Sequence, residues 1–167
     1  DVHSRLGVCV MLQDMHLALT LTAREHIALT SSYYREPLDV ARTLALAGIE
    51  AIADRRYGQL SGGQQRQVQY ALALCGRPRL LFLDEPSVGM DTAARESLWR
   101  SLRGMLAEGC AIVLTTHYLE EAEALADRVV VLAQGRVLAD GSVDALRARV
   151  RRTQIECESV LAVDELQ

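Results

Sequence analysis

Three short apolar segments of the sequence end in polar residues that could do chemistry together. Gln13 is the last residue of segment 7–13, Asp84 and Glu85 lie near the end of segment 80–86, and His117 is the last residue of segment 111–117. Ligands of open α/β sheets bind at the carboxyl ends of the strands, so we expect these side chains to face one site. Mg²⁺ keeps several waters and takes few protein carboxylates, usually beside substrate phosphates, which suits Asp84 as its ligand. Glu85 is then free to act as a general base on a water molecule.

A second candidate site lies in "LSGGQQRQ" (60–67), where a hydroxyl residue precedes two adjacent glycines and a helix-compatible stretch. If Ser61 caps that helix, its hydroxyl and the amides of Gly62 and Gly63 form a donor cluster at a positive helix end. Such an end binds phosphate, and glycine has no Cβ to keep a ligand away from the backbone. Taken alone, "SGG" also fits an ordinary capped turn, and "DEP" fits two solvated acids beside a turn.

The segments that must position these residues alternate between strand-like and helix-like patterns. Apolar runs predict strands within residues 7–13, 80–86, 111–117, 128–133 and 137–140. Periodicity predicts helices at 21–34, with Thr22 and Glu25 at capping-box spacing, at 38–48, ending at Gly48, and at 63–74, 92–107, 118–126 and 142–150. This alternation predicts an α/β fold with a mostly parallel sheet flanked by helices, and 167 residues suit one domain.

Composition limits the function classes. The net charge of −4 and pI near 5.6 provide no basic field for nucleic acid, so we expect no nucleic-acid partner. No apolar run approaches the roughly 20 residues of a membrane-spanning helix. The four cysteines contain no C-x-x-C pair, which favours buried thiols over a zinc site. All 18 basic residues are arginine, so the chain contains no lysine.

In their order along the chain, these motifs resemble those of the ATP-binding cassette (ABC) ATPases. "LSGGQ" resembles the signature motif, "LLFLDEP" the Walker B strand, "SVGMD" (87–91) the D-loop, "TTH" the switch histidine, and Gln13 the Q-loop glutamine. The likeness continues through "YLEEAEALADRVVVLAQGRVLADG" to residue 141. Ser87 and Met90 stand where threonine and leucine are commoner in the D-loop, and each retains the chemical character of the usual residue.

The resemblance implies a P-loop NTPase-like fold, with a helical subdomain at about residues 20–75, that binds ATP and Mg²⁺. It implies that Asp84 organises Mg²⁺, that Glu85 polarises the attacking water, and that His117 contacts the γ-phosphate. Gln13 would sense Mg²⁺ and a transmembrane permease subunit. In a head-to-tail dimer with a second ATPase subunit, the ATP of that subunit would be contacted by Ser61, Gly62, Gly63 and Gln64. Asp91 would link the two ATP sites across the dimer.

One motif of the family is missing from the sequence. The P-loop pattern G-x-x-x-x-G-K-[ST] needs a lysine to reach the β- and γ-phosphates, and the two glycine pairs at that spacing, in "GQLSGG" and "GMLAEG", precede no lysine. We therefore expect a partial domain over residues 1–150, truncated at its N-terminus, with residues 151–167 as an extension. The segment alone should be inactive as an ATPase, marginally stable and prone to associate, because the missing parts would cover apolar faces of the sheet.

Within the family, "THYLEEAEALADR" is most similar to ATPase subunits of bacterial exporters of drugs and related lipophilic compounds. Such a subunit lies on the cytoplasmic side of the cell membrane, held there by its permease. Two alternatives remain open at this point: a non-transport ABC ATPase, and a non-catalytic truncated cassette that only supplies "LSGGQ" to a competent partner.

Overall fold

The computed structural model describes residues 7–13 and 15–149, and these form two compact units that meet after Leu125. The first unit contains all the candidate site residues named above, from Gln13 to His117. The proposed extension, residues 151–167, lies outside the described residues, and the predicted domain boundary near residue 150 stays a prediction.

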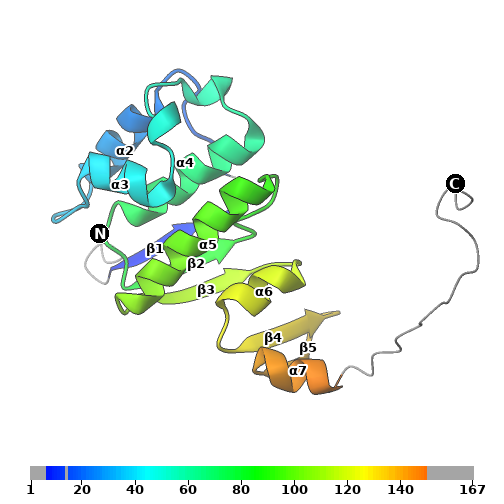
Figure 1. Ribbon diagram of the computed structural model, residues 1–167. Helices are drawn as coiled ribbons and strands as arrows, with labels where there is room; N and C mark the ends of the chain where they lie inside the picture. Colours follow the sequence, from blue (N-terminus) through cyan, green and yellow to red (C-terminus); the bar gives the residue numbers. More distant parts are fainter. Residues whose placement is uncertain (1–6, 14, 150–167) are drawn as a thin grey trace, which may run out of the picture. The chain divides into compact units, whose positions relative to one another are not determined.

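A parallel sheet forms the base of the first unit (Figure 1). It consists of β1 (Val8–Met11), β2 (Leu80–Asp84) and β3 (Ala111–Thr115), with β2 in the middle and all three strands parallel. Met11 lies beside Leu83, and Asp84 lies beside Thr115. The carboxyl ends of the strands therefore meet at one edge, as the sequence predicted.

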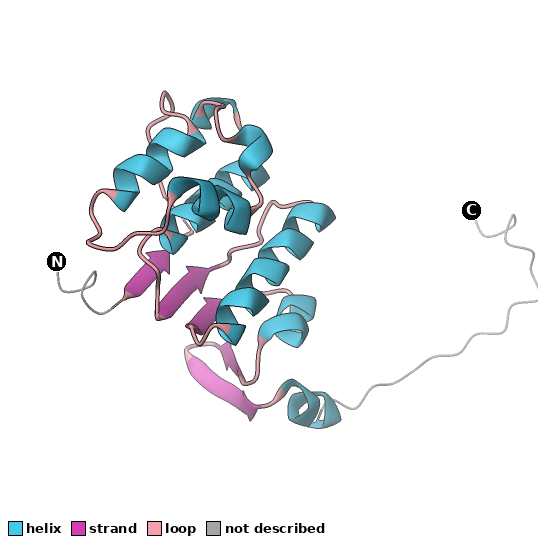
Figure 2. Ribbon diagram, turned by 60° about the vertical axis from the view of Figure 1, so that its left-hand side comes forward, coloured by secondary structure: helices cyan, strands magenta, loops and turns pink. Residues whose placement is uncertain are grey.

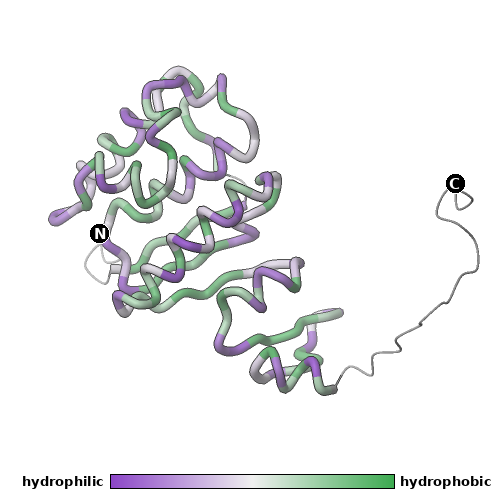
Figure 3. Tube along the Cα trace, viewed as in Figure 1, coloured by the Kyte–Doolittle hydropathy of each residue, from purple (hydrophilic) through white to green (hydrophobic). Residues whose placement is uncertain are grey.

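The two faces of this sheet differ in exposure. Cys9, Met11, Leu81 and Leu83 point to one face and are buried in the core. On the other face, Val10, Phe82 and Val113 are paired across the strands and are 48%, 38% and 50% exposed. Figure 3 shows the hydrophobic character of these strands. Parallel sheets are usually covered on both faces, whereas the described residues leave this apolar row exposed. The exposed row agrees with the tendency to associate that the sequence predicts, and that tendency stays a prediction.

Helices cover the buried face. They are α2 (Ala23–Ser31), α3 (Val40–Ala47), α4 (Gly62–Leu74), α5 (Thr92–Ala107) and α6 (Leu119–Leu125), with short 3₁₀ turns η1 (Glu50–Ile52) and η2 (Tyr57–Gln59). The helices α2, α3 and α4 pack on one another and form a helical region beside the sheet (Figure 2). The bounds of α5 match the prediction from the sequence, α4 begins one residue earlier than predicted, and the other helices are shorter by one to a few residues at their ends.

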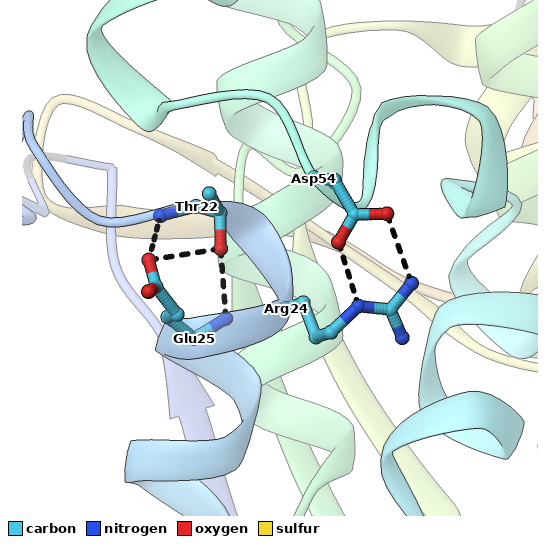
Figure 4. A network of polar contacts seen from close by, with 4 residues as sticks. All are labelled: Thr22, Arg24, Glu25 and Asp54. Atoms are coloured by element: carbon cyan, nitrogen blue, oxygen red, sulfur yellow. Dashed lines mark hydrogen bonds and ion pairs between the residues drawn. The ribbon is translucent and has the colours of Figure 1, made fainter.

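The helix caps follow the local sequence. The hydroxyl of Thr22 accepts a hydrogen bond from the Glu25 amide (3.2 Å), and the Glu25 carboxylate accepts one from the Thr22 amide (2.8 Å) (Figure 4). This confirms the predicted capping box. Beside it, Arg24 makes a two-pronged contact with Asp54 that joins α2 to the turn after η1 (Figure 4). Gly48 ends α3 in the left-handed conformation (φ 66°), which glycine adopts without strain.

The second unit is a hairpin followed by a helix. β4 (Val129–Ala133) and β5 (Arg136–Gly141) pair antiparallel, and α7 (Val143–Arg149) packs on β5. Gln134 and Gly135 both have positive φ (51° and 72°). A two-residue turn of this kind matches the twist of adjacent strands and forces them to run in opposite directions. The predicted strand, turn and strand are thus present as an antiparallel sheet of their own.

Candidate functional site

The two adjacent carboxylates differ because the chain turns sharply between them. Asp84 is the last residue of β2, and its Oδ1 accepts a hydrogen bond from the Thr115 hydroxyl at 2.6 Å. Glu85 has a φ of 49°, a left-handed conformation that costs a non-glycine residue about 1–3 kcal/mol. Its amide donates to Thr115 on β3. Glu85 therefore lies outside the strand that Asp84 ends.

Glu85 and His117 meet at this edge of the sheet. His117 Nδ1 lies 2.7 Å from Glu85 Oε2, although their side chains come from the ends of two different strands. Glu85 is mostly buried (20% exposed), whereas His117 is open to solvent (58% exposed). The imidazole is close enough for an ion pair, but no described residue donates a hydrogen bond of good geometry to Oε2. Oε2 is thus buried against the imidazole, while the Glu85 side chain as a whole keeps a partly exposed surface.

The oxygen atoms at this edge suit a hydrated Mg²⁺. The described residues contain no cluster of three or more histidine, cysteine or acidic side chains that could enclose a metal. Mg²⁺ does not need such a cage, because it retains waters and shares substrate phosphates. The Asp84 carboxylate, fixed by the Thr115 hydroxyl, offers a hard oxygen ligand with a set orientation.

Ser61 begins α4 in the way the sequence predicted. Its hydroxyl accepts a hydrogen bond from the Gln64 amide (3.3 Å), and the Gln64 side chain accepts one from the Ser61 amide (3.1 Å). Ser61 and Gly62 are exposed, and a Cβ on Gly62 would meet no atom within 4 Å. The first amides of a helix have no partner inside it, so this end offers free donors to an anion outside the chain. The Gln64 side chain, by contrast, is occupied by the cap.

Gly63 has a different role from Gly62. A Cβ on Gly63 would lie 2.7 Å from the carbonyl oxygen of Gly89, in the segment that leads to Asp91. Asp91 caps α5 by accepting a hydrogen bond from the Ala94 amide at 2.8 Å. The absence of a side chain at Gly63 thus allows the start of α4 to pack on the segment before α5.

Gln13 lies just beyond β1 with its side chain exposed, and α4 holds its backbone in place. The buried Arg66 donates to the carbonyl oxygen of Gln13 at 2.6 Å and to the side chain of Gln69 at 3.0 Å. Gln69 donates to the Met15 carbonyl and to the Tyr57 hydroxyl. Burial raises the pKa of Tyr57, so its hydroxyl stays neutral at pH 7. Apart from the position of Arg66, two residues after "LSGGQ", no pattern in the sequence indicated this network.

The predicted site residues therefore lie in two groups. Asp84, Glu85 and His117 come together at the carboxyl edge of the sheet, with Gln13 at the end of the neighbouring strand. The other group consists of the start of α4, at Ser61, Gly62, Gly63 and Gln64, together with Asp91. The packing of Gly63 on Gly89 brings the start of α4 close to the segment that leads to Asp91.

The predicted idle thiols are buried where the structure describes them. Cys9, Cys75 and Cys110 are free cysteines, and burial raises the pKa of each. In the described part of the chain, no helix has the length and apolar character to cross a membrane.

Comparison with known proteins identifies related sequences. The family model described as "ABC transporter" matches residues 1–88, which is more than half of the chain. A Nod factor export ATP-binding protein I from Burkholderia orbicola (strain AU 1054) is 41% identical over 149 residues, covering 86% of this chain and 49% of that protein. The protein of the same name from Rhizobium sp. (strain N33) is 43% identical over 148 residues, with the same coverage. The chain thus spans about half the length of the curated relatives it matches.

Solved structures share the fold. An ATP-binding cassette in a dimeric post-hydrolysis state, bound to ADP and Pi, superimposes with a TM-score of 0.72 at 26% identity, covering 81% of this chain and 62% of that one. A structure described as the ATP binding subunit of an ABC transporter gives a TM-score of 0.73 at 29% identity, covering 87% and 62%.

Proposed function

Because this chain belongs to the ABC transporter family, we propose that the protein containing it binds and hydrolyses ATP to drive transport. The observation that carries the proposal is the 2.7 Å approach of His117 to Glu85, next to Asp84 at the carboxyl edge of a parallel sheet. Ligand sites of open α/β sheets lie at this edge. A base that takes the proton of a water molecule and a hard oxygen ligand for Mg²⁺ are groups that serve phosphoryl transfer to water, and an imidazole beside them can contact the transferred group.

Each residue has a role that follows from its surroundings. Glu85 accepts the proton of the attacking water through its partly exposed carboxylate, which the His117 imidazole holds at Oε2. His117, exposed on one side and beside Glu85 on the other, contacts the γ-phosphate and that water. Asp84 and Gln13 would hold Mg²⁺, which would neutralise charge on the phosphates. Thr115 fixes Asp84 and the Glu85 backbone so that both carboxylates keep their orientation.

The exposed start of α4 serves a nucleotide on another subunit. Ser61, Gly62 and Gly63 offer a hydroxyl and free amides outward from the chain, and Gln64 keeps the cap in shape. We assign them to the γ-phosphate of ATP held by a second ATPase subunit in a head-to-tail dimer. A solved relative is described as dimeric and bound to ADP and Pi, which supports this arrangement. Asp91, linked to this corner through Gly63 and Gly89, connects the two sites across the dimer.

We assign the subunit to an exporter of a lipophilic compound, working with a transmembrane permease on the cytoplasmic side of the membrane. The support is the naming of two relatives as Nod factor export ATP-binding proteins, together with the exporter-like sequence after His117. The close approach of Glu85 and His117 also speaks against a cassette that only assists a partner, since a module without turnover has no use for a base.

The test uses the full-length subunit, assembled with its permease, and the substitution Glu85→Gln. The variant should still bind ATP but should hydrolyse it about 10²–10⁴-fold more slowly, the usual contribution of a general base. Glu120→Gln, at an exposed position in α6, is the matched control and should keep normal turnover. Unchanged hydrolysis in Glu85→Gln would reject the assignment of the base, and a wild-type protein that fails to bind ATP would reject the function.

A further inference from the structure

Two helices beside the site, α5 and α6, are joined by a regular series of contacts. Three residues of α5 spaced four apart each contact a residue at or on α6, where the partners are spaced three apart. The pairs are Arg95 with the Tyr118 ring, Trp99 with the Glu121 side chain, and Arg103 with the Ala124 carbonyl. Residues spaced three or four apart share one face of a helix. The contacts therefore run along a single seam, which we call the α5–α6 seam.

The central contact of the seam involves a buried carboxylate. Glu121 is 0% exposed, and its Oε1 accepts a hydrogen bond from the Trp99 indole at 3.1 Å. Its Oε2 has no hydrogen-bond partner among the described residues. A buried carboxylate is costly unless it is hydrogen-bonded, so this side chain depends strongly on Trp99.

The position of α6 depends on such contacts. The helix has only 7 residues, and isolated helices of fewer than about 12 residues are marginal in water. Helix α6 is therefore held in place by what it packs on, and α5 is the element that it contacts most. His117 lies immediately before this helix, so its location follows that of α6 and of Tyr118.

The end of the seam reaches the imidazole directly. The guanidinium carbon of Arg95 lies 5.0 Å from the centre of the Tyr118 ring, a cation–π distance. The Tyr118 ring lies 4.1 Å from the His117 ring, at an angle of 40°. Tyr118 is further fixed by its amide, which donates to the Thr116 hydroxyl at 3.0 Å. The Tyr118 ring thus lies between a fixed cation on α5 and the imidazole that contacts Glu85.

We propose that Tyr118 is a positioning residue for His117, and that Trp99 and Glu121 fix the helix that follows both. The α5–α6 seam holds the His117 imidazole beside the Glu85 carboxylate through the contact of the Tyr118 ring with the imidazole, and not through a hydrogen bond to the imidazole. This inference rests on the proposed ATPase function for its catalytic consequence, but the placement of His117 is a property of the fold alone.

The decisive comparison is Tyr118→Leu with Tyr118→Phe in the full-length subunit. Phenylalanine keeps the aromatic face, whereas leucine removes it. In Tyr118→Leu, kcat for ATP should fall about ten- to a hundredfold, the effect of a misplaced catalytic group, while KM stays within about twofold. Tyr118→Phe should restore wild-type kcat. The NMR chemical shifts of the His117 ring protons should change in the leucine variant only, because ring-current contact with the aromatic face is lost.

A second pair of variants tests the seam without touching Tyr118. Trp99→Phe removes the indole N–H and keeps an aromatic ring, so the His117 resonances should broaden or move and kcat should fall with little change in KM. Glu120→Gln on the same helix, being exposed, is the control that should leave both unchanged.

The outcomes separate this inference from the function. A wild-type protein that hydrolyses no ATP would reject the function, but the NMR comparison would still decide the placement of His117. Unaltered His117 resonances and kcat in Tyr118→Leu would overturn the proposal, as would equal losses in Tyr118→Phe and Tyr118→Leu. If Tyr118→Leu does not fold, the proposal is overturned by a Trp99→Phe variant in which His117 behaves as in the wild type.

Discussion

The carbonyl oxygen of Gly89 lies so close to Gly63 that a Cβ on Gly63 would approach it to 2.7 Å. Backbone atoms at that distance cannot move aside as a flexible side chain would. Gly62, one residue earlier, has open space on every side of its missing Cβ. Packing within the chain therefore leaves no room for a side chain at Gly63, whereas the position at Gly62 faces open space outside the chain.

This difference predicts opposite results for two alanine substitutions. Gly63→Ala should lower the free energy of unfolding by about 1–3 kcal/mol, the usual cost of overpacking. Gly62→Ala should leave stability within about 0.5 kcal/mol, and under the proposed function it should weaken ATP-dependent dimer formation. Urea unfolding measures the first effect, and sedimentation with ATP in a hydrolysis-deficient background measures the second. Equal stability losses in the two variants would contradict the packing seen at Gly63.

Arg66 provides a second prediction, because it holds the backbone at Gln13. Arg66→Met removes the hydrogen bond to the Gln13 carbonyl and the one to Gln69. We expect a loss of about 1–3 kcal/mol in the free energy of unfolding, since the carbonyl loses a charged donor. Backbone amide exchange around Gln13 should become faster. Arg42→Met, at an exposed position of α3, is the control and should change neither quantity.

The capping box of α2 gives a prediction about pH. Hydrogen bonds from the Thr22 backbone amide and then from its hydroxyl lower the pKa of Glu25 in the folded protein. A carboxylate with a lowered pKa adds stability above its unfolded pKa of about 4.3, and this is lost as the pH falls through the folded value. Glu25→Gln should therefore be less stable than the wild type at pH 7, and the difference should shrink below pH ~4. Circular dichroism during urea unfolding at pH 7 and pH 3.5 checks this, and a constant difference would count against it.

Replacing the other member of the box tests the cap itself. Thr22→Ala should cost about 1 kcal/mol at pH 7, and Thr22→Ser should cost much less because it keeps the hydroxyl. Equal losses in both variants would show that the hydroxyl does not stabilise α2.

Local spacing was enough to predict much of this fold. The caps at Ser61, Thr22 and Gly48 depend on residues within one helical turn, and the bounds of α5 follow from its cap at Asp91. Polar residues after apolar runs also located the site, because parallel strands bring their carboxyl ends to one edge. Such features need no information about distant parts of the chain.

The remaining features depend on contacts between distant segments. Arg66 reaches the Gln13 carbonyl across 53 positions of sequence, and the Thr115 hydroxyl reaches Asp84 across 31. Nothing in the residues near Glu85 indicated its left-handed backbone. These are tertiary effects, in which packing overrides the local preference of the chain, and they occur where the site is built.

The indole that donates to Glu121 belongs to Trp99, the sole tryptophan of the sequence. Its intrinsic fluorescence therefore comes from a single place, beside the helix that follows His117. A change in emission when nucleotide or a partner subunit is added would report movement of α6 against α5 in real time. The native protein thus contains its own optical reporter for the part of the fold closest to His117, and no dye or label has to be attached.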